Sequence, residues 1–414
     1  MGCQSVDNVI RSVAAALTCV MCGSLSPNVA AAATNDSSAN SVAPPTAHTR
    51  PHTSVAQPRP TQTKDTSHTH SPVTHSHPHV SAVRKKPLQA KLPINPNVHT
   101  SAASSESAPL LTFSVISDIH LRAGVSDWGY AICDRTAENK FAGALHDLYA
   151  IDARTDAMVI NGDLTVTGLP SDYADMIKVF EHNPHPANTL FSIGNHEFYA
   201  GFYGKSGKRN VRTFPNGVTE ETCVSRFLAN TRMPALYYDR WIEGYHFIVL
   251  GTEQSIITNR KTGDGAYLSD RQLNWLKQKL AESPVNHPVF VFLHEPIPGS
   301  VAGTLKYDVR DASKLVNVLQ THPQVILFTG HTHRTLKSPQ DDVYHNGYTE
   351  FNDSSVRYPV ISQQRWLTDS EGLYVKVYRD KVVVKSRDFT HHVWIHDYIV
   401  PVYPNYLHFM RSQP

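Results

Sequence analysis

The chain has 414 residues, with 38 Lys and Arg against 36 Asp and Glu, so its formal net charge is only +2. A charge this balanced argues against a nucleic-acid-binding protein as the obvious class, and the length fits two average domains or one large domain with dispensable ends. Because 24 histidines stand against five cysteines, a metal site would use imidazole and carboxylate ligands rather than thiolates.

Residues 1–33 have the features of an export signal. Arg11 supplies a positive charge, the apolar stretch "SVAAALTCVMCGSL" has the length of a signal-peptide core, and small residues offer cleavage sites around Ala31 to Ala33. The protein is therefore expected to be secreted or associated with the cell surface. Two alternatives stay open, namely an uncleaved membrane anchor and a lipoprotein cut before Cys22.

Residues 34–108 are dominated by Ser, Thr, Pro, Ala and His and lack apolar periodicity. Such a segment buries too little surface to offset its ordering entropy, which predicts a disordered linker. Residues 68–79 could bind transition metals, and residues 84–86 could contact an anionic cell-wall polymer or lipid. A solvated His-rich linker and a solvated charge run are the simpler interpretations.

From Leu110 onward, short β-rich segments that end in polar residues alternate with segments of helical spacing. This alternation predicts one layered α/β domain over residues 109–414. Near the end of the chain, residues 372–389 predict a β-hairpin that turns at Arg379 and Asp380. The expected strands lie within residues 110–121, 156–164, 188–197, 246–253, 287–296 and 324–333, and the expected helices at 137–150, 171–182, 269–283 and 311–322.

Candidate metal ligands follow the ends of these expected strands. In open α/β sheets, ligands gather at the carboxyl ends of strands. Asp118 and His120 are one residue apart, so in an extended chain both would face the same side. Asn195 has a structural alternative, because Asn tolerates left-handed turns. The full candidate set is Asp118, His120, Asp163, Asn195, His294, His331 and His333.

This nitrogen and oxygen ligand set suits two borderline divalent ions rather than one. Two dications, two carboxylates and one bridging hydroxide leave about one net positive charge at such a site. A site of this kind binds anions and activates water, as phosphoryl transfer to water requires.

Five motifs in order, "SDIH", "NGDL", "GNHE", "FLHE" and "GHTH", resemble the signature of the calcineurin-like metallophosphoesterases over roughly residues 110–390. The resemblance implies a β-sandwich with flanking helices (α-β-β-α) and two ions of Mn, Fe or Zn. It also implies hydrolysis of a phosphodiester or phosphomonoester by a metal-bridging hydroxide.

The resemblance also assigns roles to single residues. His196 would contact the phosphate and assist the leaving oxygen, and Asp163 would bridge the two ions. The first ion would be held by Asp118, His120, Asp163 and His333, and the second by Asp163, Asn195, His294 and His331.

Within this family the "SDIHL" and "GNHE" elements are most similar to the bacterial phosphodiesterase branch, which includes cyclic-nucleotide enzymes. Val166 stands where purple acid phosphatases have a tyrosine, and the segment after His333 is too short for the substrate domain of 5′-nucleotidases. Glu197 in place of the more usual aspartate and a long first loop at residues 122–140 depart from the bacterial pattern.

Residues 198–214 follow "GNHE" and combine aromatic residues, glycines and cations. We expect this loop to cap the site and contact phosphate or a base ring, although an exposed loop with solvated charges is an equal alternative. Its cations are Lys205, Lys208, Arg209 and Arg212.

Three further points stay open at the level of sequence. Some proteins of this fold lose their ligands and become surface-binding or scaffold proteins, but here all seven ligand positions are filled. A nuclease is disfavoured because the charge is nearly neutral. Cys133 and Cys223 could pair after export.

Overall fold

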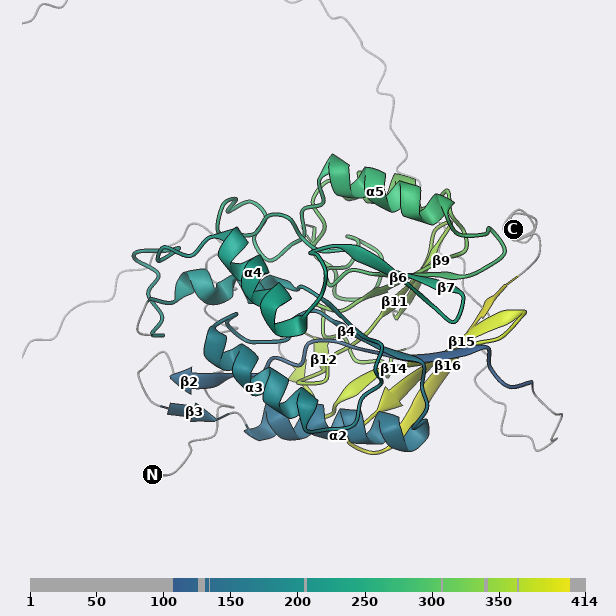
Figure 1. Ribbon diagram of the computed structural model, residues 1–414, viewed down its shortest axis with the longest axis horizontal. Coiled ribbons are helices and arrows are strands. Elements are labelled where there is room, and N and C mark those ends of the chain that lie inside the picture. Colours follow the sequence, from purple (N-terminus) through teal and green to yellow (C-terminus); the bar gives the residue numbers. More distant parts are fainter. Residues whose placement is uncertain are drawn as a thin grey trace, which may run out of the picture. The chain divides into compact units, whose positions relative to one another are not determined.

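Two six-stranded mixed β-sheets lie face to face in the computed structural model of the protein (Figure 1). The structure describes residues 107–125, 131–133, 135–204, 207–306, 308–338, 342–362 and 365–402. These residues all belong to one compact unit of the chain. The expected signal peptide (residues 1–33) and the expected linker (residues 34–108), except for residues 107 and 108, lie outside the described residues and stay predictions.

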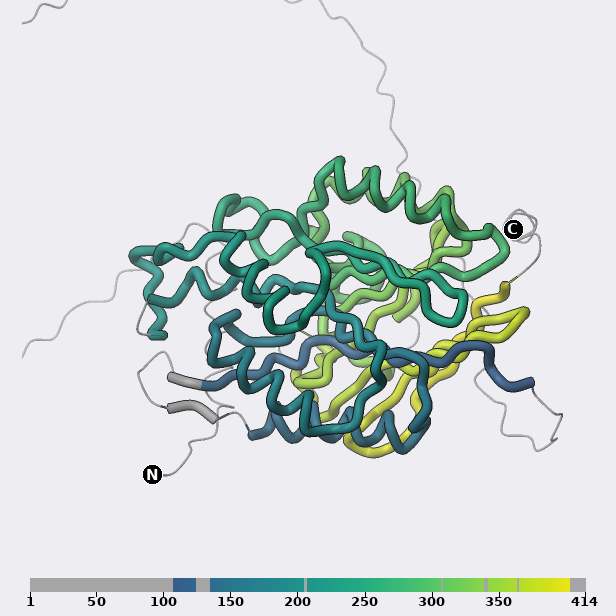
Figure 2. The backbone as a smooth tube through the Cα atoms, in the orientation of Figure 1, coloured from purple at the N-terminus to yellow at the C-terminus, as the bar shows by residue number. Residues whose placement is uncertain are grey.

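The first sheet has the strand order β16-β15-β14-β1-β4-β5. Strands β1, β4 and β5 run parallel. On the other side of β1, β14 pairs with β1, β15 with β14 and β16 with β15, each pair being antiparallel. The first described strand of the chain thus pairs with β14, which lies near its other end, and the tube in Figure 2 shows these two parts side by side. The hairpin of β14 and β15 turns at residues 378–380, which confirms the sequence prediction. The bounds are β1 Leu111–Ile116, β4 Ala157–Asn161, β5 Thr189–Ser192, β14 Glu371–Val377, β15 Lys381–Asp388 and β16 Val393–Pro401.

The second sheet has the strand order β10-β11-β9-β8-β7-β6. Its four central strands run parallel, and an antiparallel strand closes each edge. Two small hairpins, β2 with β3 and β12 with β13, complete the strands. The bounds are β6 Tyr238–Ile242, β7 Tyr245–Val249, β8 Val289–Phe292, β9 Val325–Thr329, β10 Val343–His345 and β11 Thr349–Asn352, with β2 Ala123–Val125, β3 Ala131–Cys133, β12 Val360–Ser362 and β13 Arg365–Trp366.

Helices cover the outer faces of both sheets. The apolar sides of α2, α3 and α4 pack on the first sheet, and those of α5 and α6 pack on the second. No helix among the described residues is long and apolar enough to cross a membrane. The bounds are α2 Arg135–Ile151, α3 Pro170–Glu181, η1 Asn195–Phe202 (a 3-10 helix), α4 Glu220–Thr231, α5 Asp270–Ala281 and α6 Ala312–Leu319.

Helix α4 is absent from the sequence prediction, although its start carries a recognisable signal. Thr219 caps the helix, because its hydroxyl oxygen accepts a hydrogen bond from the backbone N–H of Thr222 at 3.2 Å. Cys223 and Phe227, one turn apart, are its buried face. Cys223 is a free thiol here, and because the side chain of Cys133 lies outside the described residues, their pairing stays a prediction.

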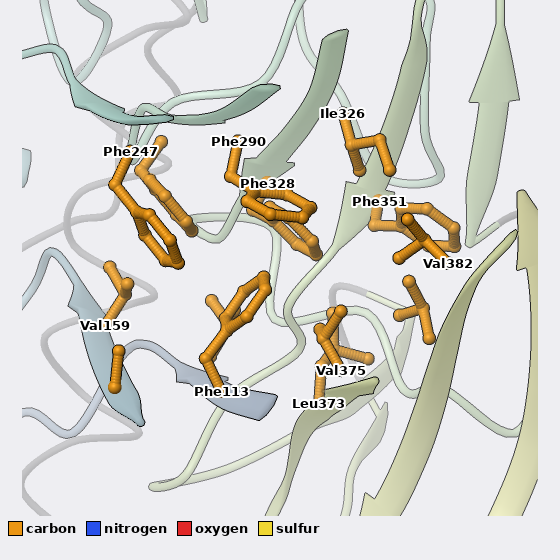
Figure 3. Packing of buried hydrophobic residues seen from close by; sticks show 14 of the residues in the cluster. Phe113, Val159, Phe247, Phe290, Ile326, Phe328, Phe351, Leu373, Val375 and Val382 are labelled. Carbon is orange, nitrogen blue, oxygen red and sulfur yellow. The ribbon is translucent and has the colours of Figure 1, made fainter. Parts of the chain in front are cut away.

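The core between the sheets combines phenylalanine rings with valine and other apolar side chains (Figure 3). Phe113 on β1 meets Phe247 on β7 and Phe290 on β8, with ring centroids 5.0 and 4.7 Å apart in edge-to-face geometry. All three rings are fully buried, and burying each one contributes about 1.5–3 kcal/mol. The α-β-β-α arrangement predicted from the sequence is confirmed.

Candidate metal centre

The seven predicted ligands follow strands of both sheets. Each lies two to four residues after the last residue of its strand, so none is in the middle of a strand. The carboxyl ends of the central parallel strands therefore bring the polar residues of both sheets to one place. Asp118 and His120 follow β1, Asp163 follows β4, Asn195 follows β5, His294 follows β8, and His331 and His333 follow β9.

The backbone is left-handed rather than extended at five of these seven positions. Asp118 and His120 have φ angles of 54° and 45°, and Asp163 has 49°. The sequence argument that Asp118 and His120 converge because they share one face of an extended chain is therefore wrong. Consecutive turns aim both side chains inward, at a conformational cost that non-glycine residues bear mostly at functional sites. Asn195 is not among the residues with positive φ, so turn geometry does not explain its presence.

Two glycines next to the ligands leave room for the ligand side chains. A Cβ atom on Gly194 would lie 2.3 Å from Oδ1 of Asp163, and one on Gly330 would lie 2.7 Å from Oδ2 of Asp118. Both distances are shorter than van der Waals contact. The glycines of "GNHE" and "GHTH" are thus explained by the close approach of the carboxylates.

Asp118, His120, Asp163 and His333 make up one group of ligand atoms that lie within 4.8 Å of one another. The Nε2 atom of His333 lies 2.8 Å from Oδ1 of Asp118 and 3.1 Å from Nε2 of His120. The Nδ1 atom of His333 faces the carbonyl oxygen of Tyr358 at 3.3 Å. A proton on this Nδ1 directs the Nε2 lone pair into the group.

Asp163, His294 and His331 make up a second group, so Asp163 is shared by both groups. The Nε2 atom of His294 lies 3.3 Å from Oδ2 of Asp163, and Nδ1 of His331 lies 3.0 Å from Oδ1 of Asn195. The Nδ1 atom of His294 faces the carbonyl oxygen of Asn161 at 2.8 Å, which again leaves Nε2 free to bind a cation.

The side chain of Asn161 ties the two sheets together beside this group. Asn161 ends β4 of the first sheet, and its Nδ2 atom donates a hydrogen bond to the carbonyl oxygen of Phe328 on β9 of the second sheet at 3.0 Å. The same Nδ2 donates to Oδ2 of Asp353 at 2.6 Å. The backbone carbonyl that orients His294 is therefore itself held between the sheets.

The buried atoms of both groups fit metal ions. Oδ1 of Asp118 and Nε2 of His294 are buried and make no hydrogen bond of regular geometry, and atoms of other candidate ligands lie 2.8 and 3.3 Å from them. Buried polar atoms without a regular hydrogen bond cost about 1–3 kcal/mol, and a cation bound among them would remove that cost. Burial alone would raise the pKa of Asp163, but the imidazoles of His294, His196 and His120 hold this pKa below its ordinary value. Asp163 is therefore ionised and ready to act as a ligand.

His196 lies beside both groups without belonging to either. Its Nδ1 atom lies 2.8 Å from the carbonyl oxygen of Val166, so Nε2 points toward Oδ2 of Asp163, 3.9 Å away. The side chain keeps 18% exposure. Burial of its nitrogens, only partly offset by the charge of Asp163, lowers the pKa of His196 to about 3. A neutral imidazole with an exposed edge lies next to the ligand atoms.

The expected basic loop is only partly among the described residues, because Lys205 lies outside them. Lys208 and Arg212 are exposed, and Arg209 is half-buried. The guanidinium carbon of Arg209 lies 5.7 Å from the ring centre of Phe202. The Phe202 ring in turn contacts the ring of Tyr199, which contacts His196.

The structure adds residues that sequence reasoning missed. The ring of Tyr358 stacks on His120 with centroids 5.4 Å apart and an interplanar angle of 15°. Asp308 is buried, and its Oδ1 atom lies 3.8 Å from Nε2 of His331. Neither residue belongs to a motif, and the sequence around them gives no local signal of proximity to the ligands.

The sequence profile of a family described as calcineurin-like phosphoesterase matches residues 111–335. A probable cyclic nucleotide phosphodiesterase of Rhodococcus erythropolis is 26% identical over 199 residues, 48% of this chain and 58% of that protein. A cAMP/cGMP dual specificity phosphodiesterase of Mycobacterium tuberculosis is 24% identical over 240 residues, 57% of this chain and 66% of that protein. The matches thus span less than two thirds of these relatives.

Among solved structures, a purple acid phosphatase from yellow lupin seeds (Lupinus luteus) is similar with a TM-score of 0.51. The similarity covers 72% of this chain and 55% of that protein at 13% sequence identity. At this identity the likeness concerns the fold alone.

Proposed function

The chain belongs to the calcineurin-like phosphoesterase family, and from this premise we propose that it is an exported, dinuclear metal-dependent hydrolase of phosphodiester bonds. The observation that carries the proposal is the sharing of Asp163 by two ligand groups, which are buried except for the half-buried His331. A shared carboxylate is what a pair of ions about 4 Å apart requires.

We assign the ligands as the geometry groups them. The first ion would be held by Asp118, His120, Asp163 and His333, and the second by Asp163, Asn195, His294 and His331. Mn, Fe and Zn all suit this mixture of imidazole, carboxylate and amide ligands. When bound, two such ions supply a bridging hydroxide at neutral pH and positive charge for the phosphate.

His196 is assigned to the leaving group. Its Nδ1 proton is directed to the carbonyl oxygen of Val166, so Nε2 is the atom that can reach a bound substrate. An anionic phosphate next to this imidazole favours the imidazolium, whose Nε2 proton can stabilise the departing oxygen. The 18% exposure of the side chain supports access from solvent.

The diester preference and the place of action rest on separate arguments. The relatives described as cyclic nucleotide phosphodiesterases act on diesters by name, which supports a diester for this chain. Lys208, Arg209 and Arg212 would contact a phosphate or a ring at the rim of the site. Residues 1–33 and the linker that follows support export and attachment near the cell surface.

The test is hydrolysis of bis-p-nitrophenyl phosphate against p-nitrophenyl phosphate by the full chain, stripped of metal and resupplied with Mn²⁺, Fe²⁺ or Zn²⁺. Metal-dependent turnover of the diester, lost in Asp163→Asn, is the expected result. Faster turnover of the monoester would replace the diesterase by a phosphatase at the same site. Metal binding without turnover of either compound would favour a surface-binding or scaffold protein.

A further inference from the structure

The side-chain amide of Asn195 has a defined orientation. Its Nδ2 atom donates a hydrogen bond to the hydroxyl oxygen of Tyr199 at 3.0 Å. Its Oδ1 atom lies 3.0 Å from Nδ1 of His331, toward the second ligand group. The orientation matters because a metal ion binds the amide oxygen and not the amide NH₂.

The hydroxyl of Tyr199 can only accept from Asn195, because its own proton is already used. The Tyr199 O–H donates to Oδ1 of Asp264 at 2.7 Å. A phenol is protonated at neutral pH, so the Tyr199 hydroxyl has one proton to donate. A carboxylate accepts and never donates, so the direction of both hydrogen bonds follows from Asp264.

These contacts join parts of the chain that the sequence does not connect. Tyr199 lies one turn after Asn195 on η1, whereas Asp264 lies in the segment between β7 and α5. The ring of Tyr199 also packs on the ring of His196, with centroids 4.1 Å apart. The hydroxyl and the ring of Tyr199 therefore serve different neighbours, and a Phe substitution separates the two contacts.

We propose that Tyr199 and Asp264 are positioning residues that fix the Asn195 oxygen toward the second metal ion. The proposal rests on the proposed function, since it presupposes an ion at the second ligand group. Without the Tyr199 hydroxyl the amide can turn over and present its NH₂ group to the ion. Without Asp264 the Tyr199 proton is free to point at Asn195, which removes the preference for either amide orientation.

The experiment is calorimetric titration of the metal-stripped full chain with Mn²⁺. Wild-type protein should bind two ions. In Tyr199→Phe, one binding step should weaken by about 10- to 100-fold while the other is unchanged, the size typical for loss of a residue that orients a ligand. Asp264→Ala should weaken the same step, and should add nothing in the Tyr199→Phe background, because it acts through that hydroxyl.

Tyr173→Phe is the matched control. Tyr173 is fully buried and its hydroxyl makes no hydrogen bond to a described residue, so this variant should bind both ions as the wild type does. Unchanged binding in Tyr199→Phe, or in Asp264→Ala should Tyr199→Phe not fold, would overturn the proposal. Equal weakening of both steps would do the same, since it indicates general damage. No binding by the wild type would instead refute the proposed function.

Discussion

Glu197 and Thr165 join the two loops that carry the central ligands. Oε1 of Glu197 accepts hydrogen bonds from both the backbone N–H and the hydroxyl of Thr165, each at 3.0 Å. Oε2 of the same carboxylate accepts the backbone N–H of Gly194 at 2.9 Å. The loop after Asp163 and the loop that starts with Gly194 are thus held together by one buried side chain.

Glu197→Gln should destabilise the protein. Burial and the charge of Asp163 raise the pKa of Glu197 to about 8, so above about pH 9 the side chain is a carboxylate on whose two oxygens three donors converge. An amide would point its NH₂ group at one of these donors, at a cost of about 1–3 kcal/mol. Urea unfolding at about pH 9 measures this difference, and a variant as stable as the wild type at that pH would contradict the convergence of the three donors.

Asp163→Asn should abolish the stabilisation by metal. Addition of Mn²⁺ at about 100 times its dissociation constant stabilises a one-site protein by about 2.7 kcal/mol, and the melting temperature of the wild type should rise accordingly. The variant should show little rise and a loss of turnover beyond about 100-fold. Asp270→Asn is the control, because Asp270 at the start of α5 pairs with Lys314 and belongs to none of the clusters of possible metal ligands among the described residues. An equal response to metal in both variants would contradict the bridging role.

His196→Ala should separate catalysis from metal binding. Metal content should stay at the wild-type level, because His196 is in neither ligand group. Turnover of a diester with an alkoxide leaving group should fall by about 100-fold or more. A p-nitrophenyl ester should lose much less, since its leaving group needs little protonation. Equal losses for both substrates would argue against assistance at the leaving oxygen.

Asp175→Asn should raise stability at high pH only. Burial, and next the carboxyl group of Glu138, raise the pKa of Asp175 to about 6 from a usual 3.8. The folded state therefore keeps its proton where the unfolded state has lost it, so stability falls as pH rises from about 4 to about 6. Discounted for partial exposure, the gain in the variant should be about 1 kcal/mol at pH 8 and vanish toward pH 4. Urea unfolding at both pH values is the measurement, and a gain at pH 4 as large as at pH 8 would contradict the assignment.

Arg209→Ala should weaken substrate binding. The guanidinium is half-buried over Phe202, two ring contacts from His196, so it is held near the site at little further entropic cost. KM should rise several-fold with kcat nearly unchanged, as expected for binding that is equal in ground and transition states. Arg232→Ala, at an exposed ion pair with Glu181, is the comparison. Identical kinetics in both variants would support the alternative interpretation, in which the loop is an exposed segment with solvated charges.

Much of the fold and the set of candidate ligands could be predicted from the sequence, because both depend on patterns of neighbouring residues. The strand before Asp118 and the helix at 137–150 have clear periodicity, and the five motifs occur in order. Helix α4 was missed, although the Thr219 cap and the spacing of Cys223 and Phe227 would have indicated it.

Other features depend on contacts between distant residues. Asp264 lies at the site because the segment before α5 folds back onto η1. Asp308 lies there because its segment contacts His331, which is distant in the sequence. The left-handed backbone of Asp118 and His120 was also unforeseen, since neither residue type indicates it reliably. These features have no short-range sequence pattern.

Because the candidate ligands follow strands of both sheets, the geometry of the centre depends on how the two sheets are aligned. Asp163 belongs to one half and His294 to the other, and Asn161 bonds across the junction beside them. A slip of one strand residue would shift these atoms by about 3.3 Å, which is larger than the spacing of the ligands can tolerate. With the proposed ions bound, the metal content of a preparation should therefore follow the fraction of molecules whose two sheets are in register.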